Sequence, residues 1–117
     1  MAFPTSTKIW AETMDPFDIV DYKVDLAPLL VDDEGIASFD VDVLPESELY
    51  GLTLGTLDYA PALDGTNLTI WLSIDSSFYS NPIFATGITL PIEVSVTTTA
   101  FPPRRRQRTV AVKVIQR

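Results

Sequence analysis

The clearest structural signal in this chain is the segment Ile88-Thr89-Leu90-Pro91-Ile92-Glu93-Val94-Ser95-Val96-Thr97-Thr98. Apolar side chains occupy the even-numbered positions up to Val96, and mostly polar ones lie between them. This period of two predicts a β-strand with one buried face. Pro91 lies on the polar side and has no N–H to donate, so the strand is expected to be an edge at that point or to carry a bulge.

A second alternating segment follows at residues 108–116. Val110, Val112 and Val114 alternate there with Thr109, Ala111 and Lys113. The connection between the two segments contains Pro102 and Pro103, which mark a turn. The two segments together predict a C-terminal β-hairpin.

Further strands are predicted upstream of this hairpin. Alternation indicates them at residues 20–26, 35–43 and 68–72, with a weaker candidate at 52–57. Pro28 suits the first position of one helical turn within 27–30. Short strands separated by Pro, Gly and Asp predict an all-β fold. We expect an immunoglobulin-like β-sandwich of about seven short antiparallel strands over residues 18–117, preceded by an extended N-terminal arm over residues 1–17.

Composition narrows the possible functions. The chain has 117 residues, of which 46% are hydrophobic, so it suffices for one domain with a real core. It contains no cysteine and no histidine, which removes disulfides, thiol nucleophiles and the commonest general base. Residues 1–11 lack the apolar stretch of a signal peptide, and the longest apolar run, 26–31, is too short to cross a bilayer. We therefore expect no enzymatic activity, cofactor, metal or membrane association.

Charge is distributed very unevenly along the chain. Residues 104–117 hold six of the eight basic residues and no acidic one, whereas all sixteen acidic residues lie between Glu12 and Glu93. An acidic body with a basic end can attract copies of itself, or a charged neighbour, head to tail.

Three groups of residues are candidates for contacts with partners. The first lies in the predicted arm, where no strand partner can be assigned, and the second in a long loop around Asn81-Pro82; the third is the arginine cluster of the last hairpin. They comprise Phe3, Ile9 and Trp10; Phe78, Tyr79 and Phe84; and Arg104, Arg105, Arg106 and Arg108. For the loop aromatics, a small satellite core is an equally good interpretation.

Each polar cluster has alternative interpretations. The arginines favour an ionic contact with an acidic neighbouring subunit, or a solvated hairpin that protects a sheet edge. Binding of nucleic acid is disfavoured because the acidic body would repel a polyanion. The aspartates between Asp15 and Asp25, and the Asp32-Asp33-Glu34-Gly35 turn, could offer oxygen atoms to Ca²⁺, but neither has the spacing of a calcium loop, and a solvated turn explains the second more simply.

The order of short motifs resembles a known family. The motifs run in the order Lys8-Ile9-Trp10, Asp15-Pro16, Asp21-Tyr22-Lys23-Val24-Asp25-Leu26, Gly35-Ile36-Ala37-Ser38, Tyr50-Gly51-Leu52-Thr53 and Trp71-Leu72-Ser73, before a Thr-rich strand that enters the last hairpin. This order, from Lys8 to Val114, resembles the fibre–tail adaptors of tailed phages, which have an immunoglobulin-like fold. The chain departs from the family in the loop 74–82 and in the turn 101–106, where the family has glycine-rich or glycine-containing turns.

The resemblance implies a mechanical function. It implies a structural component of a tailed-phage virion, assembled in the cytoplasm of the bacterial host, that attaches a fibre or appendage to the neck or tail. Its partners would be other virion proteins of the neck, tail, fibre or capsid, and copies of itself. Two alternatives remain open: a capsid decoration (cement) protein, and a β-sandwich module that binds carbohydrate or a host surface through the aromatic loop.

Overall fold

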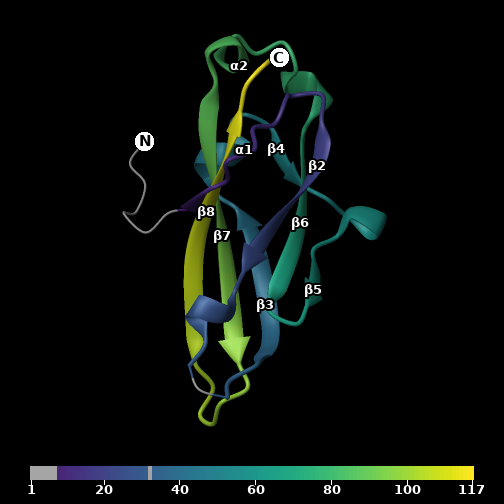
Figure 1. Cartoon of the computed structure of the whole chain (residues 1–117). Coiled ribbons are helices and arrows are strands. Elements are labelled where there is room, and N and C mark those ends of the chain that lie inside the picture. Colours follow the sequence, from purple (N-terminus) through teal and green to yellow (C-terminus); the bar gives the residue numbers. More distant parts are fainter. Residues whose placement is uncertain (1–7, 32) are drawn as a thin grey trace.

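The chain folds into two packed β-sheets. The computed structural model describes residues 8–31 and 33–117. One sheet, sheet A, has the strand order β1-β8-β7-β3, and the other, sheet B, has the order β2-β6-β4 with β5 also paired to β6 (Figure 1). The strands are β1 (Lys8–Ile9), β2 (Ile19–Asp25), β3 (Ile36–Val43), β4 (Leu52–Leu54), β5 (Ala62–Asp64), β6 (Asn67–Ile74), β7 (Ile88–Thr98) and β8 (Arg105–Val114). The expected all-β sandwich is confirmed.

Short helical turns occupy several of the connections between strands. They are η1 (Ala27–Leu29), α1 (Pro45–Glu48), η2 (Leu57–Tyr59), η3 (Ser76–Phe78) and α2 (Ile83–Thr86). The turn predicted within 27–30 is present as η1. In Figure 1, α2 lies beside the C-terminus at one end of the molecule, and the tip of the β7–β8 hairpin forms the opposite end.

The C-terminal hairpin is the longest paired unit of the fold. Its register runs from Ile88 opposite Val114 to Thr97 opposite Arg105, so β8 begins three residues earlier than the alternation indicated. On its other side β7 pairs with β3, which ends at Val43 opposite Ile92. At Pro91 the strand β7 has therefore lost its β3 neighbour, as its missing N–H led us to expect. The buried Ser47 hydroxyl of α1 donates a hydrogen bond of 2.7 Å to the Pro91 carbonyl oxygen.

The core lies between the inner faces of the two sheets. Alternate residues of β6 and β7 point into it, and their inward side chains are almost completely buried: Leu68, Ile70, Leu72, Ile74, Leu90, Ile92, Val94 and Val96. The valines at positions 110, 112 and 114 of β8 complete the layer of sheet A. Period-two alternation thus identified the buried faces of β6, β7 and β8, whereas in β3 a bulge between Ile36 and Ser38 leaves Ala37, expected on the inner face, exposed.

The segment before β2 is part of the sandwich and not a free arm. Its first two described residues form β1, which runs parallel to β8 with Lys8 opposite Val110. The backbone N–H groups of Trp10 and Met14 donate hydrogen bonds of 3.0 and 2.9 Å to carbonyl oxygens of Ala111 and Lys113. Residues 8–10 and Met14 thus pair with β8 at the edge of sheet A, so the domain begins before the predicted boundary at residue 17. Residues 1–7 lie outside the described part of the chain.

Gly51 allows the chain to turn tightly beneath the aromatic loop. Its φ of 83° lies in the left-handed region that side-chain-bearing residues avoid. A Cβ atom at this position would lie 2.5 Å from the Phe78 ring, which is closer than van der Waals contact permits. Glycine therefore allows η3 to pack directly onto the β4 turn.

Candidate functional site

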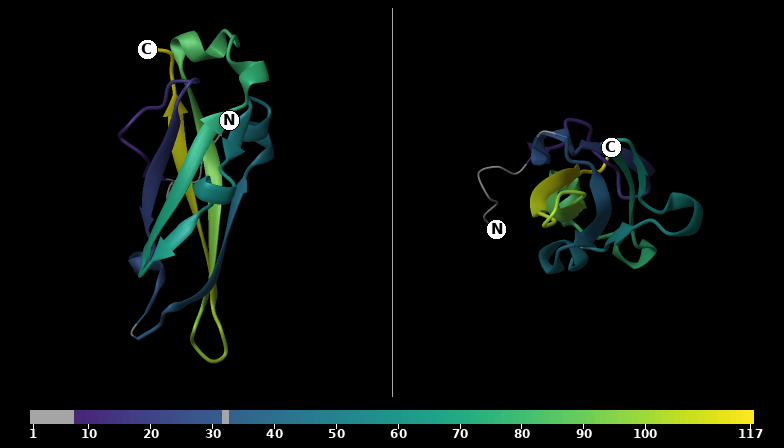
Figure 2. Two further views of the ribbon diagram at one scale, coloured as in Figure 1. Left: turned by 90° about the vertical axis from the view of Figure 1, so that its right-hand side faces the viewer. Right: turned by 90° about the horizontal axis from the view of Figure 1, so that it is seen from below.

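The tip of the β7–β8 hairpin presents an apolar side chain to solvent. Phe101, at the turn between the strands, is 99% exposed, and Pro102 and Pro103 follow it. The two strands run on beyond the end of sheet B, so the tip projects from the body (Figure 2). Burial of this exposed side chain against a partner would be favourable, which makes the tip a candidate contact surface.

The arginine cluster divides between the two faces of the hairpin. Arg106 lies opposite Val96 and Arg108 opposite Val94, so both are on the side of the core, whereas Arg105 lies opposite Thr97 on the outer side. Alternation along β8 causes this division. The cluster is therefore not a single basic patch.

Two of the four arginines contact other parts of the same chain. The Nε atom of Arg104 lies 3.5 Å from the Glu34 carboxylate, and an Nη atom of Arg108 donates to the Asp25 carbonyl oxygen at 3.2 Å. Among residues 8–31 and 33–117, Arg105 and Arg106 have no carboxylate within ion-pair distance. These two exposed arginines leave positive charge beside the hairpin tip.

Glu34 anchors the turn that covers the inner side of the hairpin. Its carboxylate accepts a hydrogen bond of 2.9 Å from the Val31 N–H, and this bond is the main cause that holds the pKa of Glu34 below its ordinary value. Thr98 and the charges of Arg104 and Arg106 lower the pKa further, against the opposing effect of burial. Glu34 therefore stays ionised and keeps Arg104 in place at neutral pH.

The outer face of sheet B carries a small aromatic pocket. The pocket has a volume of about 200 Å³, and its lining includes Ile19, Leu54, Gly55, Tyr59 and Trp71. Tyr59 lies edge-on to Trp71 with ring centroids 5.1 Å apart, so one wall is aromatic. Ile19 is 57% exposed at the rim, although the strand around it is well ordered by pairing with β6.

Two further exposed apolar side chains are close in sequence to residues that line this pocket. Leu57 is 93% exposed in the η2 loop, which stands out from the body as the teal projection of Figure 1. Its φ of 56° is unusual for a leucine, and strained residues of this kind are concentrated at functional sites. Phe17 is 65% exposed and packs against Tyr79 with ring centroids 4.4 Å apart. This apolar surface was not predicted from the sequence.

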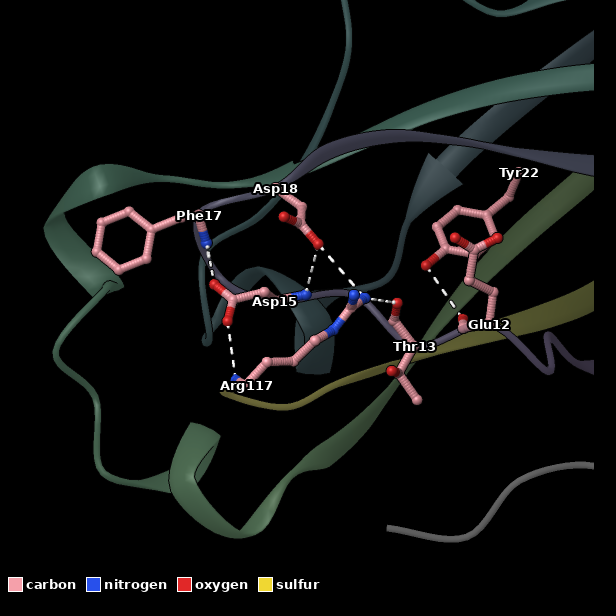
Figure 3. Close-up of polar contacts among 7 residues, drawn as sticks. All are labelled: Glu12, Thr13, Asp15, Phe17, Asp18, Tyr22 and Arg117. Atoms are coloured by element: carbon pink, nitrogen blue, oxygen red, sulfur yellow. Dashed lines mark hydrogen bonds and ion pairs between the residues drawn. The ribbon is translucent and has the colours of Figure 1, made fainter.

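Arg117, at the C-terminus, binds the segment that leads into β2. Figure 3 shows the backbone N–H of Arg117 donating to the Asp15 carboxylate at 2.9 Å. The Arg117 side chain donates to the Thr13 carbonyl oxygen and lies 3.5 Å from the Asp18 carboxylate. Hydrogen bonds to its carboxylate from the N–H groups of Phe17 and Arg117 hold the pKa of Asp15 below its ordinary value. Protonation of Asp15 in acid would therefore weaken the contact between Arg117 and this segment.

These contacts bear on the calcium alternative. The carboxylates of Asp15 and Asp18 are engaged by backbone N–H groups and by Arg117. Within residues 8–31 and 33–117, no three side chains of the kinds that ligate metals come together.

The predicted partner-contact residues have different positions in the fold. Phe3 lies outside the described residues. Trp10 and Phe84 are buried, 9% and 0% exposed, so their assignment to a surface was wrong: both belong to the core. Phe78 and Tyr79 are half-buried and pack against the core, as the satellite-core interpretation proposed, while Ile9 is 51% exposed.

Tyr22 gives a pH-dependent test of the packing of this segment. Its ring stacks on Trp10 with centroids 4.6 Å apart, and its hydroxyl donates to the Glu12 carbonyl oxygen at 3.1 Å. Burial, assisted by the negative charge of Glu12, raises the pKa of Tyr22 to about 12. The folded state thus disfavours the ionised phenol. The contribution of the neutral Tyr22 to the stability of the fold is complete below about pH 10 and is lost as the pH rises toward 12.

We expect Tyr22→Phe to lower the free energy of unfolding at neutral pH by about 1 kcal/mol, because a hydrogen bond is lost. Above about pH 10 the difference in free energy of unfolding between the two proteins should narrow, because only the wild type has a phenol at this position whose ionisation opposes folding. Urea unfolding followed by tryptophan fluorescence over a range of pH measures both effects. Parallel pH profiles for the two proteins would contradict the buried position of the hydroxyl.

Comparison with known proteins adds no relative. No protein-family model matches the chain, and no curated protein sequence is similar to it. In residues 8–31 and 33–117, no helix has the length and apolar character needed to cross a membrane.

Proposed function

We propose that this chain is a non-enzymatic structural component of a tailed-phage virion, in which it acts as an adaptor that attaches a fibre or appendage to the neck or tail. Its partners are then other virion proteins and further copies of the chain itself, assembled in the cytoplasm of the bacterial host. The ordered motifs from Lys8 to Val114 are the basis of this assignment.

The strand order supports the immunoglobulin-like part of the proposal. In immunoglobulin domains one sheet contains strands A, B, E and D and the other contains C, F and G. The order β2-β6-β4 corresponds to B-E-D, and β3-β7-β8 corresponds to C-F-G. Strand β5 is additional, and the tryptophan of sheet B lies on β6, whereas antibody domains have theirs on strand C.

One observation carries the adaptor role: two segments that project from this small domain, the hairpin tip and the η2 loop, each present an exposed apolar side chain. Phe101 projects from the hairpin tip, while Leu57 and Ile19 project from the outer face of sheet B. The domain is elongated, with extents of 48 × 32 × 22 Å, so these places can contact different neighbours. An adaptor needs two such surfaces, one for each of the neighbours that it joins.

The experiment is a quantitative inventory of purified particles. Virions produced by the phage that encodes this chain would be purified, and their proteins counted by mass spectrometry. We expect the chain in a fixed ratio to the neck and tail proteins. Its absence from particles that contain a complete tail would contradict the proposal.

The same measurement tests the decoration alternative. A decoration protein covers the capsid shell and follows the copy number of the major capsid protein, whereas an adaptor occupies one symmetry axis. The exposed surface of the sandwich would serve either position, so the stoichiometry decides between them. Particles lacking tails but retaining the chain would favour the capsid.

A further inference from the structure

We infer that copies of this chain assemble head to tail, with the hairpin tip of one copy seated in the aromatic pocket of the next. The tip is the segment 99–104 with Phe101 at its apex, and the pocket is the one lined by Ile19, Tyr59 and Trp71. This inference specifies one partner for the two surfaces on which the proposed adaptor function rests. It concerns the isolated chain, so it can fail while the virion assignment holds.

The pocket has the size and chemistry to receive a phenyl ring. The pocket is an open depression of about 200 Å³, and an enclosed apolar cavity of about 150 Å³ already accommodates benzene, so one face and edge of a phenyl ring can enter it. Its wall contains the edge-to-face pair of Tyr59 and Trp71, and aromatic rings favour offset or edge-on contact with a third ring. No charged side chain lines it, so an entering phenylalanine would displace water without leaving a buried charge unpaired.

The hairpin tip is suited to insertion. Phe101 is 99% exposed, so the part of its ring that enters the pocket gains the full free energy of removal from water. Two prolines follow it and restrict the backbone of the turn, which lowers the entropy lost on docking. A single aromatic anchor in a fitting pocket is the usual form of a binding hot spot.

Charge complementarity argues for a second copy as the occupant. The strands of sheet B and η2 carry the exposed aspartates 21, 25, 58 and 64, with Lys23 as their only basic residue. The hairpin 99–108 carries four arginines and no acidic residue, and Arg105 and Arg106 are exposed beside Phe101. Asp21 lies opposite Trp71 and Asp58 precedes Tyr59, so docking would bring the basic hairpin near negative charge beside the pocket, which favours association at low salt.

Within one copy, the hairpin tip cannot reach the pocket. The tip lies at one end of the molecule, whereas the pocket lies on the flank beside the η2 projection (Figure 2). The contact is therefore heterologous, and repetition of such a contact produces rings if the rotation closes and open chains if it does not.

Sedimentation analysis of the purified chain tests the inference. We expect the wild type to self-associate with increasing concentration, and the association to weaken at high salt. Phe101→Ala and Ile19→Arg should each weaken it about tenfold or more, because one removes the anchor and the other fills the pocket with a like charge. Both positions are exposed, so both variants should fold.

Leu49→Arg is the matched control for the pocket variant. Leu49 is an equally apolar residue, 72% exposed, that lies outside the pocket and the hairpin tip. Its replacement should leave the association unchanged. An effect as large as that of Ile19→Arg would show that added charge, and not the pocket, controls the association.

A mixing experiment tests the head-to-tail geometry. The Phe101→Ala chain retains its pocket and the Ile19→Arg chain retains its tip, so an equimolar mixture should form a one-to-one dimer although each variant alone is monomeric. The wild type completes this test: a heterologous contact builds species larger than a dimer, whereas an isologous exchange of tips, which would also regain one contact in the mixture, stops at the dimer.

Two results would overturn the inference. The first is a wild-type chain that remains monomeric at low salt over the whole concentration range. The second is a monomeric wild type that binds immobilised glycans with a dependence on Ile19, because the occupant of the pocket would then be a carbohydrate.

Discussion

Replacement of Phe84 by alanine is expected to lower the free energy of unfolding by about 3–5 kcal/mol. Phe84 lies in α2, where its side chain is completely buried in the core. Its carbonyl oxygen also accepts a hydrogen bond of 2.7 Å from the Gln116 N–H, which ties α2 to the C-terminus. Truncation removes buried apolar surface and leaves a cavity that the rigid strands cannot close. Chemical denaturation measures the change.

Phe101→Ala is the internal control for this prediction. Both residues are phenylalanines in connections between strands, but Phe101 is 99% exposed. Its removal should change the free energy of unfolding of the monomer by no more than about 0.5 kcal/mol. Equal losses of stability in the two variants would contradict the placement of α2 in the core.

Replacement of Trp10 by alanine is expected to lower the free energy of unfolding by about 3 kcal/mol or more. The indole ring is 9% exposed, stacks on Tyr22, and donates from Nε1 to the Lys23 carbonyl oxygen at 3.0 Å. The variant would lose this packing and would leave the Lys23 carbonyl oxygen without its donor. Because the segment 8–17 has few other buried side chains, we also expect faster hydrogen exchange at the amides of Trp10 and Met14.

Ile9→Ala provides the comparison for Trp10. The neighbouring Ile9 shares the strand β1 but is 51% exposed, so its truncation should cost less than about 1 kcal/mol. If Trp10→Ala lowered the free energy of unfolding no more than Ile9→Ala does, the segment 8–17 would contribute little to the stability of the fold. That result would favour the interpretation of this segment as an arm.

Local alternation predicted the long strands well because a strand with one buried face has apolar residues at every second position of a short, continuous segment. Leu90, Ile92 and Val94 point the same way in any extended chain, whatever lies opposite them. The hairpin was predicted for a related reason: its two strands are adjacent in sequence and joined by a proline-marked turn.

Contacts between segments that are distant in the sequence produce no comparable local pattern. Strand β1 pairs with β8 about a hundred residues further along the chain, and two residues are too few to alternate. Trp10 was therefore interpreted as a partner contact, although Tyr22 and the Lys23 carbonyl oxygen enclose it. The same limit applies to Phe84, since composition alone does not separate an aromatic loop that contacts a partner from one that folds inward.

Sequence by itself determined the all-β class, the buried faces of β6, β7 and β8 and the opposite charges of the body and the C-terminal hairpin. These are local or additive properties, which side-chain order along the chain expresses directly. Tertiary structure decided which aromatic residues are buried, divided the arginines between two faces, and brought Ile19, Tyr59 and Trp71 together as a pocket. Such features depend on which strands become neighbours, and that choice is made by packing the whole core.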